Sequence, residues 1–299
     1  MITALADAVA AGPVVLDGGL ATQLESQGHN LNSELWSARL LHDDPDAIVQ
    51  AHLAFFAAGA QVATTASYQA SIGGFARAGI EQAEAEQLIR RSVRLAEQAR
   101  ASCDGGRARW IAGSIGPYGA ALADGSEYRG DYGLSVDELR AWHRPRIALL
   151  IEAGVDVLAL ETIPCLAEVE ALLAEIDGSG QPCWLSVTCA GNRTRAGEPA
   201  AAAFSLARGV DEIVAVGVNC IDPVDAHSLV RCASESTSKP AVVYPNGGER
   251  WDPSARTWIG PATFRSEDVE DWISSGARLV GGCCRVGPAE IKAIRDLVG

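Results

Sequence analysis

Short apolar runs recur along the whole chain and alternate with segments in which apolar residues return every three or four positions. Eight runs are nearly continuous, and they lie at residues 14–16, 61–65, 110–114, 157–161, 183–188, 214–219, 241–244 and 279–282. Continuous apolar runs of this length are typical of parallel strands covered on both faces. The amphipathic segments between them predict helices, so the alternation predicts a repeated strand–helix unit.

Signals for helix ends fall between the apolar runs, where the repeat requires them. Residues 92–97 are predicted to end one helix, residues 136–154 to form another, and Ser266 lies at the start of a third with cap-like chemistry. Gly59, Gly154 and Gly276 each stand just before a predicted strand. Glycine in this place is the usual signal for the C-terminus of a helix.

Eight strand–helix units without a break in composition predict an α/β fold, a TIM-type (βα)8 barrel that spans residues 1–299 as one domain. A doubly wound sheet is the main alternative. It usually has fewer strands and a phosphate-binding glycine fingerprint after the first strand. Here the first run leads into Asp17-Gly18-Gly19, which lacks that fingerprint. Two long connections, residues 116–135 and 245–262, are predicted to be lids or binding loops.

The charge balance excludes some partners. The 299 residues include 24 basic and 38 acidic side chains, a formal net charge of −14. Such a chain repels phosphate backbones and anionic membranes, so we expect no nucleic acid and no membrane as partner. Asp7 interrupts the apolar start, and no uncharged apolar run reaches the ~18–20 residues of a membrane span. We therefore expect a cytoplasmic protein whose eight cysteines are mostly thiols; the sequence does not predict its oligomeric state.

Chemically active residues cluster where predicted strands end, which is the face of a barrel that carries its active site. Cys220 ends the sixth strand, and Cys283 and Cys284 follow two glycines at the end of the eighth. Three thiolates would leave one position open on a tetrahedral Zn²⁺, and soft thiolates favour zinc over magnesium or calcium. The alternative is three unrelated buried cysteines, since a vicinal pair is less diagnostic than two cysteines separated by two residues.

A zinc ion with one open position suits a particular chemistry. A substrate thiol that binds there loses its proton near neutral pH, because the cation favours the anion. The bound thiolate can then attack an electrophilic carbon. Activation of water for hydrolysis is less natural, because three thiolates donate much charge and leave a weak Lewis acid.

Several longer motifs carry a resemblance to a known family. They are Leu16-Asp17-Gly18-Gly19-Leu20-Ala21-Thr22, Thr64-Thr65-Ala66-Ser67-Tyr68-Gln69-Ala70, Gly113-Ser114-Ile115-Gly116-Pro117-Tyr118-Gly119, Leu160-Glu161-Thr162, Gly217-Val218-Asn219-Cys220, Tyr244-Pro245-Asn246 and Gly281-Gly282-Cys283-Cys284-Arg285. With these motifs the chain resembles the homocysteine S-methyltransferases. The resemblance is strongest to the branch of that family that uses S-methylmethionine or, in some members, S-adenosylmethionine as methyl donor. The resemblance implies a (βα)8 barrel in which Cys220, Cys283 and Cys284 bind the catalytic zinc.

The resemblance also implies roles around the metal. It assigns Asp17 and Glu161 to the ammonium group of homocysteine. Thr64 and Asn219, with Ser67 nearby, can hydrogen-bond the substrate carboxylate or the zinc thiolates. Trp36 and Tyr68 can face the sulfonium of the methyl donor by cation–π attraction. The expected reaction is direct transfer of the donor's methyl group to the homocysteine thiolate, giving methionine.

Two other functions stay open at this point. One keeps the zinc and the reaction but uses selenocysteine or another small thiol as acceptor. The other is a different class of protein, in which the cysteines store zinc or sense redox state through a Cys283–Cys284 disulfide. Storage or sensing needs neither the two carboxylates at the strand ends nor the two long loops, so these features favour the enzyme.

Overall fold

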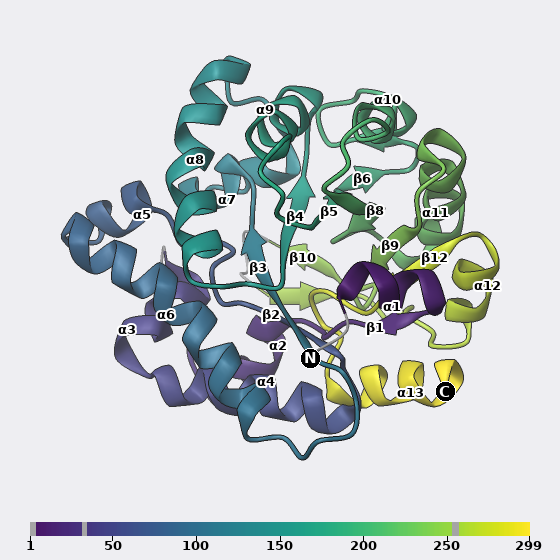
Figure 1. Ribbon diagram of the computed structural model, residues 1–299, viewed down its shortest axis with the longest axis horizontal. Helices are drawn as coiled ribbons and strands as arrows, with labels where there is room; N and C mark the ends of the chain where they lie inside the picture. Colours follow the sequence, from purple (N-terminus) through teal and green to yellow (C-terminus); the bar gives the residue numbers. More distant parts are fainter. Residues whose placement is uncertain (1–3, 32–34, 253–256) are drawn as a thin grey trace.

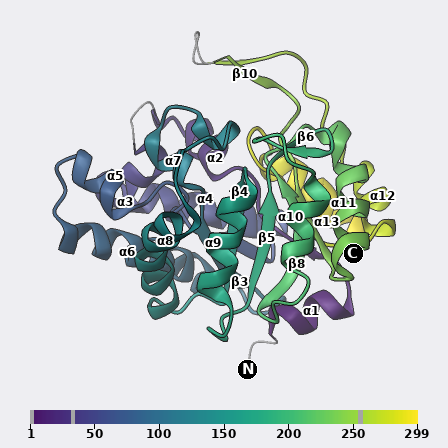
Figure 2. The same ribbon diagram turned by 90° about the horizontal axis from the view of Figure 1, so that it is seen from above.

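The computed structural model describes residues 4–31, 35–252 and 257–299, and Figures 1 and 2 show it from two sides. Eight parallel strands form one curled sheet in the order β1-β12-β9-β8-β5-β4-β3-β2. Their bounds are β1 Val14–Val15, β2 Val62–Thr64, β3 Trp110–Ile115, β4 Val157–Ile163, β5 Cys183–Val187, β8 Ile213–Asn219, β9 Ala241–Tyr244 and β12 Ala277–Val280. The first and last strands of this order meet, since the Gln61 N–H donates to the Val15 carbonyl at 2.7 Å. The predicted TIM-type barrel is confirmed.

Helices surround the barrel and connect its strands (Figure 1). They are α1 Leu5–Ala11, α2 Leu20–Ser26, α3 Leu40–Asp43, α4 Pro45–Ala58, α5 Ile72–Arg77, α6 Gln82–Ala101, α7 Tyr118–Leu122, α8 Val136–Glu152, α9 Leu166–Ile176, α10 Ala200–Leu206, α11 Pro223–Thr237, α12 Asp268–Ser274 and α13 Pro288–Val298, with 3₁₀ turns η1 Trp36–Arg39 and η2 Ser126–Tyr128. Local chemistry fixes their ends. Ser135 forms a capping box with Glu138 at the start of α8.

The glycines predicted to end helices adopt the required conformation. Gly59, Gly154 and Gly276 have φ of 109°, 88° and 111°, in the left-handed region that L side chains avoid. The helix predicted to end near residue 97 continues to Ala101 as α6, and the one predicted at Ser266 begins at Asp268 as α12. These shifts of a few residues are ordinary for helix boundaries.

The two long connections contain regular structure that the sequence did not predict. Residues 116–135 include α7 and η2, and residues 245–262 include a hairpin of β10 Arg250–Asp252 and β11 Thr257–Ile259. A second small hairpin, β6 Cys189–Ala190 with β7 Arg193–Thr194, follows β5. In Figure 2 the β10 hairpin extends away from the barrel, and β6 and α7 lie near the same end. α1 lies at the opposite end in that view.

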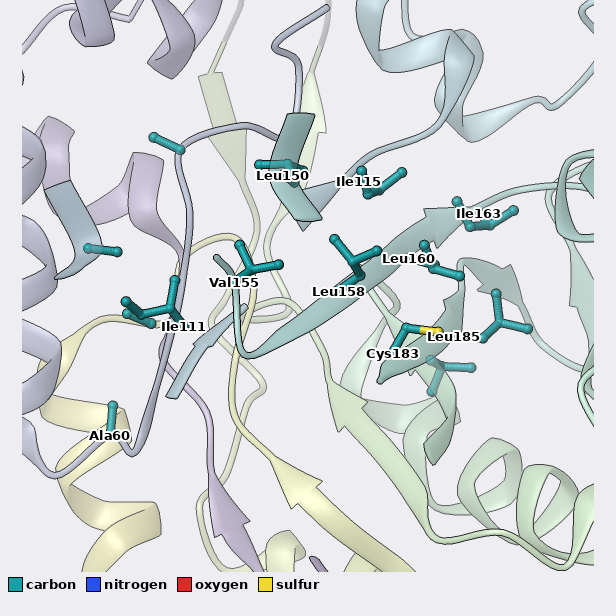
Figure 3. Close-up of a cluster of buried hydrophobic side chains, with 14 of the residues drawn as sticks. Ala60, Ile111, Ile115, Leu150, Val155, Leu158, Leu160, Ile163, Cys183 and Leu185 are labelled. Atoms are coloured by element: carbon teal, nitrogen blue, oxygen red, sulfur yellow. The ribbon is translucent and has the colours of Figure 1, made fainter. Parts of the chain in front are cut away.

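Apolar side chains pack on both faces of the sheet. Leu158, Leu160 and Leu185 point outward and meet helix residues such as Leu150 of α8 (Figure 3). Alternate positions point into the barrel, where the fully buried indoles of Trp110 and Trp184 fill the interior. Burial of one large apolar side chain contributes roughly 1.5–3 kcal/mol, so these two layers hold the strand ends in place.

The inner layer also includes Leu5 and Val9 of α1. This short helix therefore packs against the end of the barrel remote from the strands' carboxyl ends. Within the described part of the chain, no helix is both long and apolar enough to cross a membrane.

Candidate active site and metal centre

The carboxyl ends of β8, β9 and β12 are joined by backbone hydrogen bonds that place the three predicted metal ligands. The Cys220 N–H donates to the Tyr244 carbonyl at 3.2 Å, and the Cys283 N–H donates to the Pro245 carbonyl at 2.7 Å. The Cys284 carbonyl in turn accepts from the Gly247 N–H at 2.8 Å. The end of β9 therefore lies between the strands that carry the cysteines and bonds to both.

The sulfur atoms of Cys220, Cys283 and Cys284 all lie within 4.8 Å of one another. Cys220 is buried, and the vicinal pair is half-buried, so one side of the cluster faces the open end of the barrel. Three cysteine sulfurs at this spacing with one accessible side match, in their thiolate form, the donor set of a catalytic zinc site. The residues therefore fit the metal that the sequence predicts.

Cys220 and Cys283 are joined as a disulfide in this structure, and Cys284 is a free thiol. The Cys283–Cys284 disulfide considered for a redox sensor is therefore wrong, because Cys283 pairs with a cysteine of another strand. A metal ion is bound by thiolates, so the form that binds metal is the reduced one. Burial and the nearby charges of Glu25, Glu127 and Glu161 raise the pKa of Cys284 to about 12.

Close packing explains the glycines around the cluster. A Cβ atom on Gly281 would lie 2.7 Å from the Asp17 carbonyl oxygen, and one on Gly19 would lie 2.6 Å from the Cys283 carbonyl oxygen. The connection after β1 thus packs directly on the connection after β12. Larger residues there would push Asp17 away from the cysteines.

Asp17 is buried at the end of β1, and both of its carboxylate oxygens are hydrogen-bonded to Thr64 at the end of β2. Burial raises the pKa of Asp17 to about 7, and the charge of Glu161 adds to this, while the bonds from Thr64 lower it. The carboxylate of Asp17 thus links β1 to β2 and lies near Glu161.

Glu161 is buried near the end of β4, with 7% of its surface exposed. Its oxygens accept hydrogen bonds from the Ser114 hydroxyl and, at 3.0 Å, from the Tyr244 hydroxyl. Burial raises the pKa of Glu161 to about 6, although these bonds and the charge of Arg146 lower it. Among the described residues neither Asp17 nor Glu161 forms an ion pair, so a cation is the missing partner in this part of the site.

A buried polar network continues from Glu161 across the barrel. The Tyr244 hydroxyl is 2.7 Å from the Ser186 hydroxyl, which donates to Asn219 Oδ1 at 2.8 Å. The same Asn219 oxygen accepts from the Thr162 N–H at 2.6 Å, and Asn219 Nδ2 donates to the Thr162 hydroxyl at 2.7 Å. Asn219 thus uses its amide within the network, and its contact with substrate stays a prediction.

Thr162 has a φ of 60°, which is rare for a β-branched residue. Backbone conformations of this kind persist where the surrounding structure enforces them, and they cluster at functional sites. Here the two hydrogen bonds with Asn219 enforce it. The strained residue directly follows Glu161 and so helps to aim its carboxylate.

Of the two aromatic residues predicted to face the methyl donor, the structure describes the side chain of Tyr68 only. Tyr68 packs its ring on Gly116, and a hydrogen bond links its side chain to Thr162. Burial, together with the neighbouring Tyr128, Glu127 and Glu161, raises its pKa well above the usual value. Trp36 begins η1, but its side chain lies outside the described residues. A role for either residue toward the donor stays a prediction.

A charged cluster beneath the site holds two of its loops. Arg146 of α8 donates to the carbonyls of Gly116 at 2.5 Å and Tyr68 at 3.2 Å. Glu168 of α9 accepts from the Tyr118 N–H at 2.6 Å and bonds to His143 Nε2 at 2.8 Å. Burial lowers the pKa of His143, although the bond to Glu168 raises it.

Sequence reasoning missed several parts of this site. Ser114 and Tyr244 were visible as residues at strand ends, but nothing in the sequence showed that both bond to Glu161. Ser186 and Arg146 had no signal at all, because a polar residue in an apolar strand or helix is not linked to a partner by sequence spacing.

Comparisons with known proteins agree with this geometry. Residues 14–298 match the family model described as homocysteine S-methyltransferase. The chain is 47% identical over 292 residues to homocysteine S-methyltransferase YbgG of Bacillus subtilis, covering 94% of this chain and 93% of that one. It is 40% identical to selenocysteine methyltransferase of Astragalus bisulcatus, covering 95% and 92%.

A solved structure supports the same conclusion. The metallated form of the homocysteine methyltransferase MmuM from Escherichia coli superposes with a TM-score of 0.87 at 40% identity and covers 96% of each chain. The fold and the site thus define a barrel methyltransferase with a cluster of three cysteines at the carboxyl ends of its strands. The chain belongs to the homocysteine S-methyltransferase family, and methyl transfer to homocysteine, giving methionine, is its activity.

Proposed function

We propose that the chain transfers a methyl group to homocysteine from a sulfonium donor, preferably S-methylmethionine. We also propose that it binds Zn²⁺ through Cys220, Cys283 and Cys284. The observation that carries this proposal is the position of the three-sulfur cluster next to two buried carboxylates that form no ion pair among the described residues. The sulfur cluster, with a bound metal ion, fits a substrate thiol, and the two carboxylates fit a substrate ammonium group. Homocysteine carries both a thiol and an ammonium group.

The chain's own residues would orient the acceptor. Asp17 and Glu161 attract the substrate ammonium, and this attraction is strong because the carboxylates are buried. Thr64 holds Asp17, and the network of Tyr244, Ser186 and Asn219 holds Glu161. Zinc bound by the three cysteines would favour the thiolate form of the acceptor.

The methyl transfer itself needs alignment more than acid–base catalysis. A carbon–sulfur bond forms to the acceptor while the donor's methyl–sulfur bond breaks in line with it, and the donor leaves as a neutral thioether. Tyr68, half-buried beside Gly116, would face the sulfonium with its ring. S-Methylmethionine needs no nucleotide-binding motif, and the first strand lacks a glycine fingerprint for phosphates.

The test is methyl transfer with purified, zinc-loaded protein. Homocysteine labelled with deuterium in its carbon chain is supplied with S-methylmethionine or with S-adenosylmethionine, and labelled methionine is measured by mass spectrometry. We expect faster transfer from S-methylmethionine and one zinc per chain by metal analysis. Full activity in metal-free protein would contradict the zinc role, and transfer from S-adenosylmethionine alone would contradict the donor.

The acceptor requires its own comparison, because one of the similar proteins is named as a selenocysteine methyltransferase. The same assay with selenocysteine in place of homocysteine measures this. We expect homocysteine to be preferred. A higher kcat/KM for selenocysteine would reverse that order without affecting the proposed metal or donor.

A further inference from the structure

Arg195 lies next to the metal-binding cysteines, on the turn that follows β7. Its Nε donates to the Thr188 hydroxyl at 3.3 Å, and its Nη2 lies 3.5 Å from the carbonyl oxygen of Cys220. The hairpin of β6 and β7 therefore brings a positive charge to the end of β8, beside the first ligand of the metal.

A second contact places the same guanidinium near the third ligand. The Cζ atom of Arg195 lies 5.4 Å from the ring centroid of Tyr128, which belongs to η2 in the connection after β3. Burial raises the pKa of Tyr128, and the neighbouring Cys284 raises it further. Arg195 is thus held between the loops that follow β3 and β5, above the sulfur cluster.

The charge of Arg195 is not paired. In the part of the chain that the structure describes, Arg195 is half-buried and forms no ion pair. Its two hydrogen bonds are long, and the carbonyl oxygen of Cys220 already accepts from the Thr188 hydroxyl at 3.2 Å. A guanidinium has five N–H donors in a rigid fork that matches a carboxylate. Most of these donors are free to meet a ligand.

The substrates of this reaction suggest which ligand that is. The acceptor's ammonium is assigned to Asp17 and Glu161 on the inner side of the site, and its sulfur to the cysteines. The donor has to approach the sulfur from the open side, where the loops after β3 and β5 lie. An amino-acid donor carries an α-carboxylate into that region. We propose that Arg195 binds the α-carboxylate of the methyl donor, an inference that rests on the proposed function.

This role would give the enzyme a preference among sulfonium compounds. Two parallel N–H···O bonds fix a carboxylate in direction as well as in position. The stacking contact with Tyr128 holds the guanidinium plane before the donor arrives, so little side-chain entropy remains to be lost on binding. A sulfonium compound without a carboxylate would gain nothing from Arg195.

The experiment compares zinc-loaded wild type with Arg195→Met, Arg195→Lys and the control Arg193→Met. Arg193 lies on the same hairpin but is exposed and bonds to the Gly197 carbonyl at 2.6 Å. KM and kcat are measured with S-methylmethionine and with its decarboxylated analogue, (3-aminopropyl)dimethylsulfonium. We expect Arg195→Met to raise the KM for S-methylmethionine about tenfold or more, with kcat and the KM for homocysteine unchanged.

The other two variants and the decarboxylated donor serve as controls. Arg195→Lys should recover part of the affinity, Arg193→Met should match wild type, and the decarboxylated donor should show no difference between wild type and Arg195→Met. An unchanged KM for S-methylmethionine, an equal rise for both donors or a rise for homocysteine instead would overturn the proposal. If wild type uses only S-adenosylmethionine, the proposed donor is wrong, and the same comparison with S-adenosylmethionine and its decarboxylated form decides the role of Arg195.

Discussion

Asp17 and Thr64 face each other across the seam where the barrel closes. Asp17 Oδ2 accepts from the Thr64 backbone N–H at 2.6 Å, and Oδ1 accepts from the Thr64 hydroxyl at 2.8 Å. β1 and β2 are the two ends of the strand order, so these bonds join the sheet to itself at the level of the active site. Thr64 therefore stabilises the charged form of a predicted substrate-binding carboxylate.

Replacing this threonine tests that relationship. Thr64→Val keeps the shape and the backbone bond but removes the hydroxyl, so the pKa of Asp17 should rise above about 7. Less of Asp17 is then ionised at neutral pH, and the KM for homocysteine should rise about tenfold, as expected for loss of a hydrogen bond to a charged group. Steady-state kinetics at pH 7 and pH 8.5 measure this. An increase in KM that is the same at both pH values would argue against an effect through Asp17.

Glu161→Gln keeps size and hydrogen bonding but removes the charge proposed to hold the substrate ammonium. The KM for homocysteine should rise roughly 10- to 150-fold, because a charge-assisted hydrogen bond contributes about 1.5–3 kcal/mol. The KM for the donor and the zinc content should stay as in wild type. Loss of zinc would instead assign Glu161 to the metal shell, and a rise in the donor's KM alone would assign it to the sulfonium.

The two raised carboxyl pKa values predict a pH dependence. Asp17 with a pKa of about 7 and Glu161 with a pKa of about 6 bind an ammonium only when ionised, so affinity for homocysteine should increase as pH rises from 5 to 8. We expect KM to fall at least about tenfold over this range. In Glu161→Gln the part of this change near pH 6 should disappear. A flat profile in wild type would show that neither carboxylate meets the ammonium.

Removing one thiol tests the metal centre. Cys284→Ala leaves an incomplete set of soft ligands, so zinc should bind more weakly and most activity should be lost. Cys103→Ala is the matched control. Cys103 is a free cysteine just after α6, and its thiol donates to the Ala99 carbonyl of that helix. Zinc content and rate are measured on one preparation of each variant. If Cys284→Ala keeps the zinc content and the rate of wild type, Cys284 is not a metal ligand and the vicinal pair has only a structural role.

The charged cluster beneath the loops predicts a stability effect. Glu168→Gln removes the buried carboxylate that bonds to His143 and acts on the charge of Arg146. Breaking such a buried arrangement typically costs about 3 kcal/mol or more, so the midpoint of thermal unfolding should fall by roughly 5 °C or more for a chain of 299 residues. Glu170→Gln, at an exposed position of the same helix, is the control. Equal midpoints for the two variants would contradict the effect.

The barrel could be predicted because its strands are buried on both faces and therefore read as continuous apolar runs. The clustering of Cys220, Cys283 and Cys284 could be predicted for a related reason, since strand ends converge at one rim and three cysteines stand there. α1 was not predicted, because Leu5 and Val9 are too few to show a helical period.

The polar network could not be predicted from spacing. Ser186 lies inside an apolar strand, and only the closed barrel brings it within 2.7 Å of the Tyr244 hydroxyl from another strand. Arg195 was missed for a different reason. It lies in a hairpin of two-residue strands, too short to produce an alternating pattern, and its neighbours Tyr128 and Cys220 come from other connections.

The end of β9 has a consequence for how this cluster of three cysteines could change over evolution. It bonds to Cys220 through the Tyr244 carbonyl and to Cys283 through the Pro245 carbonyl, and it supplies no metal ligand itself. Two consecutive peptide units at the end of a strand without a ligand therefore set the spacing between cysteines that lie 63 residues apart in the chain. Because both bonds use backbone carbonyls, side-chain replacements at Pro245 should leave that spacing intact, whereas insertion or deletion of a single residue there should separate the cysteines although all three remain in the sequence.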